Sequence, residues 1–149
     1  MKQRELVITL LHKAEQDEAA MSRLLPDADL DDEIIGFHAQ QAVEKSLKAW
    51  LSHLGIDYPK VHSLETLLEL LNAQGHALPP LLDNVSQLTP FATVFRYEDL
   101  PLSSSFDRAD ALRLVRGVLA HVKSIVMDNV SETCSPNLSP TTCSDATQE

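Results

Sequence analysis

Apolar residues recur through most of the chain every three or four positions, which is the spacing of one face of an α-helix. Segments with this pattern are residues 3–25, 32–54, 63–74, 79–95 and 107–126. The second segment has the broadest apolar face, and that face includes Trp50, the single tryptophan of the chain. We therefore predict a bundle of about five antiparallel helices, with residues 32–54 as the central helix and Trp50 buried.

Residues with strong effects at helix ends set the boundaries of these segments. Pro26 follows the first segment, while Gly55 and Gly75 follow the second and third, where glycine is a common helix stop. Asp107 is a good N-cap for the last helix. In the fourth segment, Pro90 predicts a break or kink at Thr89. The positions of this segment expected to face inward are Leu81, Leu82, Val85, Leu88, Phe91 and Phe95.

The composition favours an all-α domain, because the chain has only 4 glycines and is rich in residues that favour helices. Residues 131–149 contain no aromatic side chain and are rich in serine, threonine and proline, a composition that buries too little surface to fold. We predict one helical domain over residues 1–130 and a disordered tail over residues 131–149. Cys134 and Cys143 lie in this tail, and we expect two reduced thiols.

The formal net charge of -10 excludes strong non-specific attraction to nucleic acid or anionic membranes, so any contact with phosphate must be local. No apolar run approaches the roughly 20 residues of a membrane span, and the charged N-terminal segment is unlike a signal peptide. We expect a cytoplasmic protein that does not bind membranes. Gly-rich phosphate loops and paired metal-binding histidines are missing from the sequence, so we expect no metal and no cofactor.

Two groups of polar residues are candidates for a binding site. His38, Gln41, Lys45 and Lys48 share one face of the second helix, since they follow spacings of three and four. This face is either a ligand-binding surface or a solvated surface opposite the core. The second group follows two phenylalanines, in the sequence FRYED.

In FRYED, Arg96 could bind a phosphate through its forked guanidinium, and Tyr97 could stack on a base or offer its hydroxyl to a transfer reaction. The alternative is an ion pair between Arg96 and Glu98 or Asp99 that fixes the loop, with Tyr97 as a partly buried cover.

Three motifs in order resemble a known family: FHAQQAVEKSLKAWL, then HSLETLLELL, then FRYED before a last amphipathic helix. They are similar to the bacterial and archaeal HEPN pattern (higher eukaryote and prokaryote nucleotide-binding domain), over residues 3–127. The resemblance implies a helical bundle that usually dimerises. Many members are encoded beside a minimal nucleotidyltransferase as toxin–antitoxin pairs, and in some pairs that partner adds AMP to a tyrosine.

The resemblance therefore implies a homodimer that binds a nucleotide or RNA and has a minimal nucleotidyltransferase as its partner. Within it, we expect Arg96 to bind phosphate, Tyr97 to stack or to be modified, and Lys45 and Lys48 to act as supporting cations. His38 and Gln41 complete the expected binding residues. A purely structural dimeric adaptor without a ligand is another possible role.

Some HEPN proteins are metal-independent RNases that use an arginine followed, after four to six residues, by a histidine. Arg116 and His121 have this spacing, so a second reading is an RNase toxin in which Arg116 stabilises the phosphate and His121 is the general acid or base. The sequence departs from the family pattern at Gly117, where a polar residue is common, and at Lys123, where a tyrosine is common. Five residues of helix also rotate the chain by about 140 degrees, which directs Arg116 and His121 to different faces.

The remaining histidines have simpler interpretations. His62 stands directly before the third helix, where we expect it to cap that helix, with binding of a phosphate as the alternative. His12, His53 and His76 have no companion at a telling spacing, and we expect them at the surface.

Overall fold

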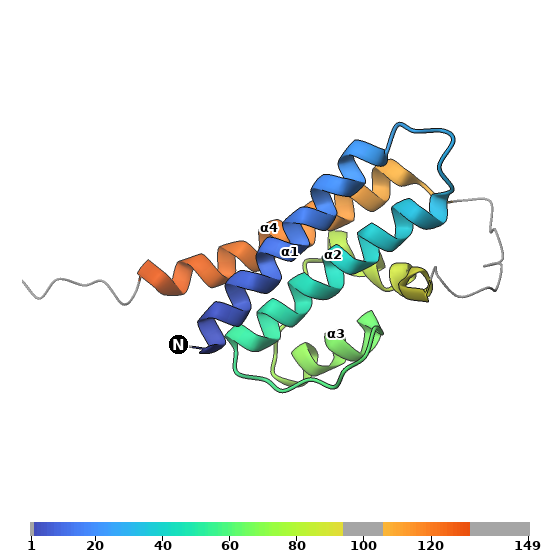
Figure 1. Ribbon diagram of the computed structural model, residues 1–149. Helices are drawn as coiled ribbons and strands as arrows, with labels where there is room; N and C mark the ends of the chain where they lie inside the picture. The colour runs from blue at the N-terminus through green and yellow to red at the C-terminus, as the bar shows by residue number, and fades with distance from the viewer. Residues whose placement is uncertain (1, 94–105, 132–149) are drawn as a thin grey trace, which may run out of the picture.

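The computed structural model describes residues 2–93 and 106–131 (Figure 1). Its elements are α1 (Lys2–Leu24), α2 (Asp32–His53), α3 (Leu64–Ala73), the 3₁₀-helix η1 (Pro80–Thr93) and α4 (Arg108–Ser131). These ranges contain five helices and no strand, which confirms the predicted all-α class. The segment that carries Arg96 and Tyr97, and residues 132–149 of the predicted tail, lie outside the described residues, whereas Ser131 is the last residue of α4.

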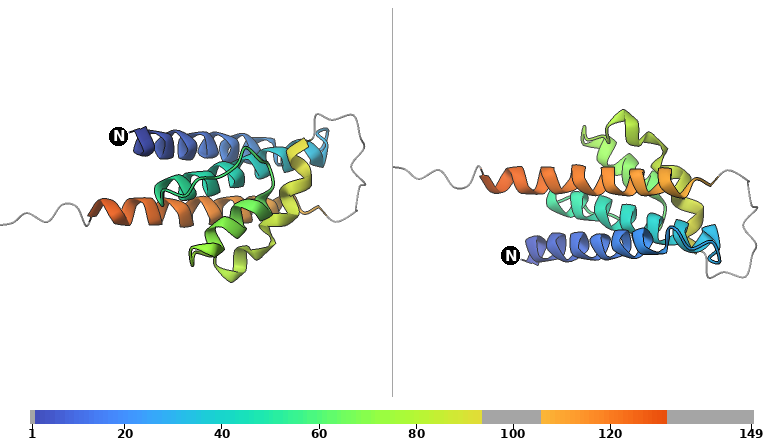
Figure 2. Two further views of the ribbon diagram at one scale, coloured as in Figure 1. Left: turned by 90° about the horizontal axis from the view of Figure 1, so that it is seen from below. Right: turned by 90° about the horizontal axis from the view of Figure 1, so that it is seen from above.

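The long helices α1, α2 and α4 lie side by side, and α2 is in the middle of the molecule (Figure 2). Helix α2 contacts each of the other four helices. Every residue of α2 is consequently buried or half-buried, as expected for a central helix. Between α2 and α3 the chain turns at Gly55, whose positive φ of 71° is a backbone conformation that glycine adopts readily.

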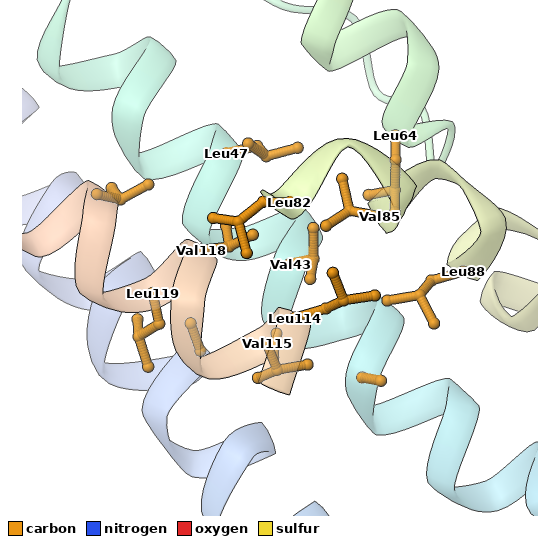
Figure 3. Close-up of a cluster of buried hydrophobic side chains, with 14 of the residues drawn as sticks. Val43, Leu47, Leu64, Leu82, Val85, Leu88, Leu114, Val115, Val118 and Leu119 are labelled. Carbon is orange, nitrogen blue, oxygen red and sulfur yellow. The ribbon is translucent and has the colours of Figure 1, made fainter. Parts of the chain in front are cut away.

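One part of the core lies where α2, η1 and α4 meet (Figure 3). The labelled side chains there are Val43, Leu47, Leu64, Leu82, Val85, Leu88, Leu114, Val115, Val118 and Leu119. All of them are buried. Trp50 is only 2% exposed, which confirms its predicted burial.

Element η1 differs in type from the α-helix predicted for this segment. Leu82, Val85 and Leu88 are buried and recur every three residues, which matches the three residues per turn of a 3₁₀-helix. Leu81 is one position away from that row and is 79% exposed, so its predicted inward position was wrong. The predicted break at Thr89 is absent, because η1 continues through Pro90 to Thr93. Phe95 lies outside the described residues.

Arg108, the first residue of α4, fastens that helix to the turn between α1 and α2. Its guanidinium Nε donates to Asp32 at 2.7 Å, and its other nitrogens donate to the backbone carbonyls of Leu25, Asp27 and Leu30. One side chain therefore satisfies three carbonyl groups of the turn that follows α1. Asp107 caps α4 as predicted, since its Oδ1 accepts from the amide of Asp110 at 3.1 Å.

Gly36 of α2 lies directly against the Phe91 ring of η1, and it provides a test of this packing. A Cβ atom added to Gly36 would overlap the ring of Phe91, whereas a Cβ at Gly117 of α4 would meet only the end of the flexible Leu82 side chain. We expect Gly36→Ala to lower the free energy of unfolding by about 1–3 kcal/mol, although alanine favours helix. Gly117→Ala, the matched control, should change it by less. Urea unfolding of both variants measures this, and equal effects would contradict the packing described.

Candidate functional site

The polar side chains of α2 form two groups, each around one carboxylate. In the first group, Asp17 of α1 binds both His38 and Lys45 of α2. The His38 Nδ1 lies 3.1 Å from the Asp17 Oδ1, and the Lys45 ammonium forms an ion pair with the Asp17 Oδ2. All three side chains are more than two-thirds buried, so this pairing joins α1 to α2 at a largely buried position.

The second group surrounds Glu44, whose side chain is only 5% exposed. The Gln40 amide donates to the Glu44 Oε2 at 2.8 Å, and the Lys48 ammonium donates to the Glu44 Oε1 at 2.7 Å. The His62 Nδ1 lies 3.1 Å from the Glu44 Oε2. Gln41 extends the group, because its amide donates to the Gln40 Oε1 at 2.7 Å. We call Gln40, Gln41, Glu44, Lys48 and His62 the Glu44 cluster.

These contacts keep the buried Glu44 ionised. Burial alone would raise the pKa of the Glu44 carboxyl, but hydrogen bonds from Lys48, Gln40 and His62, together with the charge of Lys48, outweigh it and lower the pKa below the ordinary value of 4.5. A carboxylate that accepts three hydrogen bonds needs few waters, which explains how this charge is retained beside the core.

The row formed by His38, Gln41, Lys45 and Lys48 is therefore not a solvated face. Its members share one side of α2, as the spacing predicted. All four side chains are half-buried, however, and each forms a hydrogen bond with a neighbouring side chain. The solvent-facing interpretation was wrong because α2 has neighbours on every side. Both cations of the row, Lys45 and Lys48, are paired with carboxylates.

The link from α2 to α3 supplies the outer part of the Glu44 cluster. The link runs back along α2 (Figure 1), so that Tyr58 meets Ser52 and Lys48, and His62 meets the earlier Glu44. The Tyr58 hydroxyl is 3.3 Å from the Ser52 Oγ, and the Lys48 Nζ is 5.8 Å from the centre of the Tyr58 ring.

His62 does not cap α3 as we predicted. The cap is Ser63, whose side chain accepts a hydrogen bond from the Thr66 amide at 3.3 Å. The His62 ring points instead to Glu44, and its backbone carbonyl accepts from the Gln40 amide at 3.1 Å. A serine directly after the histidine offered the stronger capping signal.

Arg116 and His121 do not converge on one point within the chain. The Arg116 Nε donates to Glu18 of α1 at 2.8 Å, and its Nη2 donates to Ser22 at 3.3 Å. The His121 ring instead lies edge to face with Trp50 of α2, with 5.3 Å between ring centres. The different directions expected from their spacing are therefore present in the structure.

The other histidines divide between surface and interior. His12 is exposed as predicted, while His53 is half-buried. His76 is also half-buried, and its ring centre lies 5.9 Å from that of Trp50. The Trp50 indole N–H has no hydrogen-bond acceptor among the residues that the structure describes.

Sequence reasoning missed Gln40 and Glu44, the two most buried members of the cluster. Gln40, Glu44 and Lys48 are four residues apart in succession, and that spacing was a readable signal for contacts along one helix. The contacts of this helix with Asp17 and His62 join residues that are 18 to 28 positions apart in the sequence, so no local pattern indicates them.

Within residues 2–93 and 106–131, the structure holds no helix with the length and hydropathy of a membrane span.

Comparison with known proteins gives one match. The family model described as the HEPN domain matches residues 7–125. The chain therefore belongs to the HEPN family, as the three sequence motifs indicated. Neither a curated protein nor a solved structure matches the sequence.

The lowered pKa of Glu44 predicts a defined dependence of stability on pH. An ionised Glu44 stabilises the fold above about pH 4.5, and this contribution disappears as the pH falls through the lower pKa of the folded state. Glu44→Gln should therefore lower the free energy of unfolding by about 1–3 kcal/mol at pH 7. The difference from wild type should shrink below pH 4.5, as urea unfolding from pH 7 to pH 3 would show.

The matched control is Glu69→Gln on α3, where the glutamate is exposed. Its effect should stay within about 0.5 kcal/mol across the same range. If the difference between wild type and Glu44→Gln stayed constant down to pH 3, the ionised state assigned to Glu44 would be wrong.

Proposed function

We propose that this HEPN chain is the helical, nucleotide- or RNA-binding half of a toxin–antitoxin-type module, with a minimal nucleotidyltransferase as the other half. The observation that carries the proposal is the family match over residues 7–125, together with the motifs that placed the chain near HEPN proteins of this kind. We further propose that the chain acts as a homodimer in the cytoplasm.

Arg116 and His121 point in different directions, which favours a role in binding RNA or a nucleotide over RNA cleavage by this pair. An RNase that used them would need both side chains near one phosphodiester, with the histidine within hydrogen-bond reach of the 2′-hydroxyl. Here Arg116 is bound to α1, while His121 packs on Trp50. Arg116 is 57% exposed and its ion pair is at the surface, so a phosphate could still displace Glu18, but His121 would need a separate rearrangement.

Because both cations of the row on α2 are paired with carboxylates, we expect a phosphate to bind elsewhere. Lys45 is neutralised by Asp17, and Lys48 by Glu44, so neither contributes an unbalanced positive charge. In a chain with a net charge of -10, a phosphate needs a local cation. Arg96, beside the aromatic Tyr97, remains the best candidate in the sequence, in the segment outside the described residues.

Exposed apolar side chains support an assembly with other chains. Leu6 and Ile8 near the start of α1 are 45% and 56% exposed, and Met127 near the end of α4 is 64% exposed. The start of α1 and the end of α4 lie at the same end of the bundle (Figure 2). Large apolar side chains at one end are typical of surfaces that a second chain covers. A dimeric adaptor without a ligand would use the same surface.

Substitution of Arg96 tests the ligand site. We expect Arg96→Ala to weaken binding of ATP or of a labelled single-stranded RNA by about tenfold to a hundredfold, because a hydrogen bond to a charged group contributes roughly 1.5–3 kcal/mol. Arg116→Ala, the matched control, should have a smaller effect. Fluorescence anisotropy measures binding, and circular dichroism checks that each variant is folded.

Unchanged binding by a folded Arg96→Ala variant would refute the assignment of Arg96. Failure of the wild-type chain to bind either ligand would leave the adaptor role. Copurification of the chain with the product of an adjacent nucleotidyltransferase gene tests the partner, and the absence of any such gene would contradict that part of the proposal.

A further inference from the structure

Two ion pairs join α1 to α4 at the surface, and both have the same polarity. Glu15 of α1 pairs with the Lys123 ammonium of α4, and Glu18 of α1 accepts from the Arg116 Nε at 2.8 Å. The side chains of Glu15, Lys123 and Arg116 are 40%, 39% and 57% exposed. In these pairs α1 supplies the carboxylates and α4 supplies the cations, so the line where the two helices meet has an acidic side and a basic side.

Two exposed apolar side chains continue the same rows. Ile8 is seven residues before Glu15, which is about two turns of helix, and Met127 is four residues after Lys123. The side chains of Ile8 and Met127 are 56% and 64% exposed. We call the surface formed by these two rows the α1–α4 seam, which consists of Ile8, His12, Glu15 and Glu18 of α1 and Arg116, Ala120, Lys123 and Met127 of α4.

The two apolar side chains lie at similar heights along the seam. The ion pairs show that α1 and α4 are antiparallel, because Glu15 pairs with Lys123 whereas the later Glu18 pairs with the earlier Arg116 (Figure 2). At 1.5 Å per residue, Ile8 is about 10 Å and Met127 about 6 Å beyond the Glu15–Lys123 pair, on the same side of it. Ile8 and Met127 are thus within one helical turn of each other in height.

This pattern is complementary to itself. A two-fold rotation about an axis that runs along the seam keeps each residue at its height and lays α1 of one copy against α4 of the other. Ile8 then lies close to Met127 of the second copy, and Glu15 lies close to Lys123 of the second copy. The apolar side chains of the two copies cover one another, and each carboxylate faces a cation.

The charge of the seam favours a second copy over a partner of one sign. Each copy has a net charge of -10, so two copies repel one another except through a face where charges balance. Two carboxylates and two cations balance in the seam. A uniformly basic or acidic surface would be repelled by one of the two rows.

We propose that the α1–α4 seam is the face by which two copies of this chain form a dimer, about a two-fold axis parallel to α1 and α4. Ile8 and Met127 of both copies form the apolar centre of the interface, and Glu15 and Lys123 set which helix faces which. The inference rests on the homodimer of the proposed function, and it adds where the copies meet and in which orientation.

The first test is the oligomeric state of the full chain, measured by sedimentation equilibrium over a range of concentrations. We expect the wild type to be a dimer, and the double variant Ile8→Asp with Met127→Asp to dimerise about a hundredfold more weakly or not at all, because apolar area is no longer buried. The matched control is Leu81→Asp on η1, where the leucine is 79% exposed but lies outside the seam. This variant should dimerise like the wild type, and circular dichroism checks that each variant is folded.

A pair of charge reversals tests the orientation. Glu15→Lys makes both members of the Glu15–Lys123 pair positive, and Lys123→Glu makes both negative, so each variant alone should dimerise about tenfold more weakly or worse. An equimolar mixture should form a mixed dimer, because every cation of one variant then faces a carboxylate of the other. The pair within each chain stays broken in the mixture, so a purely structural role of this pair predicts no recovery.

The outcomes separate this inference from the proposed function. A dimer that persists in the folded Ile8→Asp, Met127→Asp variant, or a mixture of charge variants that stays monomeric, would overturn the interface and leave the homodimer standing on another face. A wild type that is monomeric at every concentration would overturn the homodimer as well. If that monomer bound a nucleotidyltransferase through Ile8 and Met127, the seam would belong to that partner instead. Binding of RNA or ATP is measured separately and depends on none of these results.

Discussion

The structure depends on a helix that has neighbours on every side and nevertheless carries charged residues. Each residue of α2 is at least half-buried, so its polar side chains cannot rely on bulk water. Asp17 of α1 pairs with His38 and Lys45, and Glu44 binds Gln40, Lys48 and His62. These pairings join α1 and the link to α3 to α2. Leaving either carboxylate without its partners would place an unbalanced charge beside the core.

The same pairings fix the position of an exposed histidine. A charge retained in the interior needs hydrogen bonds, and one of the donors that Glu44 uses is a histidine whose ring extends into solvent. The link between α2 and α3 brings that histidine to Glu44, because it runs back along α2 (Figure 1). An interaction that stabilises the fold thus also orients an exposed imidazole ring.

Much of the fold could be predicted from the sequence, because helix ends and apolar periodicity are local. The predicted segments 3–25 and 32–54 correspond to α1 and α2 within about one residue at each end, and Trp50 is buried as expected. The 3₁₀ geometry of η1 was missed, although its row of apolar residues spaced by three was present. The Glu44 cluster could not be predicted, since its surroundings are set by contacts between distant segments. Arg96 and Tyr97 lie outside the described residues, so their role is still a prediction.

The most direct test of the account is the tautomer of His62, because it depends on both the burial and the ionisation of Glu44. Nitrogen-15 NMR of the labelled full chain at pH 7.5 distinguishes a protonated from an unprotonated ring nitrogen. We expect a hydrogen on Nδ1 and an unprotonated Nε2 in the wild type, and a changed pattern in Glu44→Gln. A hydrogen on Nε2 with an unprotonated Nδ1 in the wild type would contradict the account.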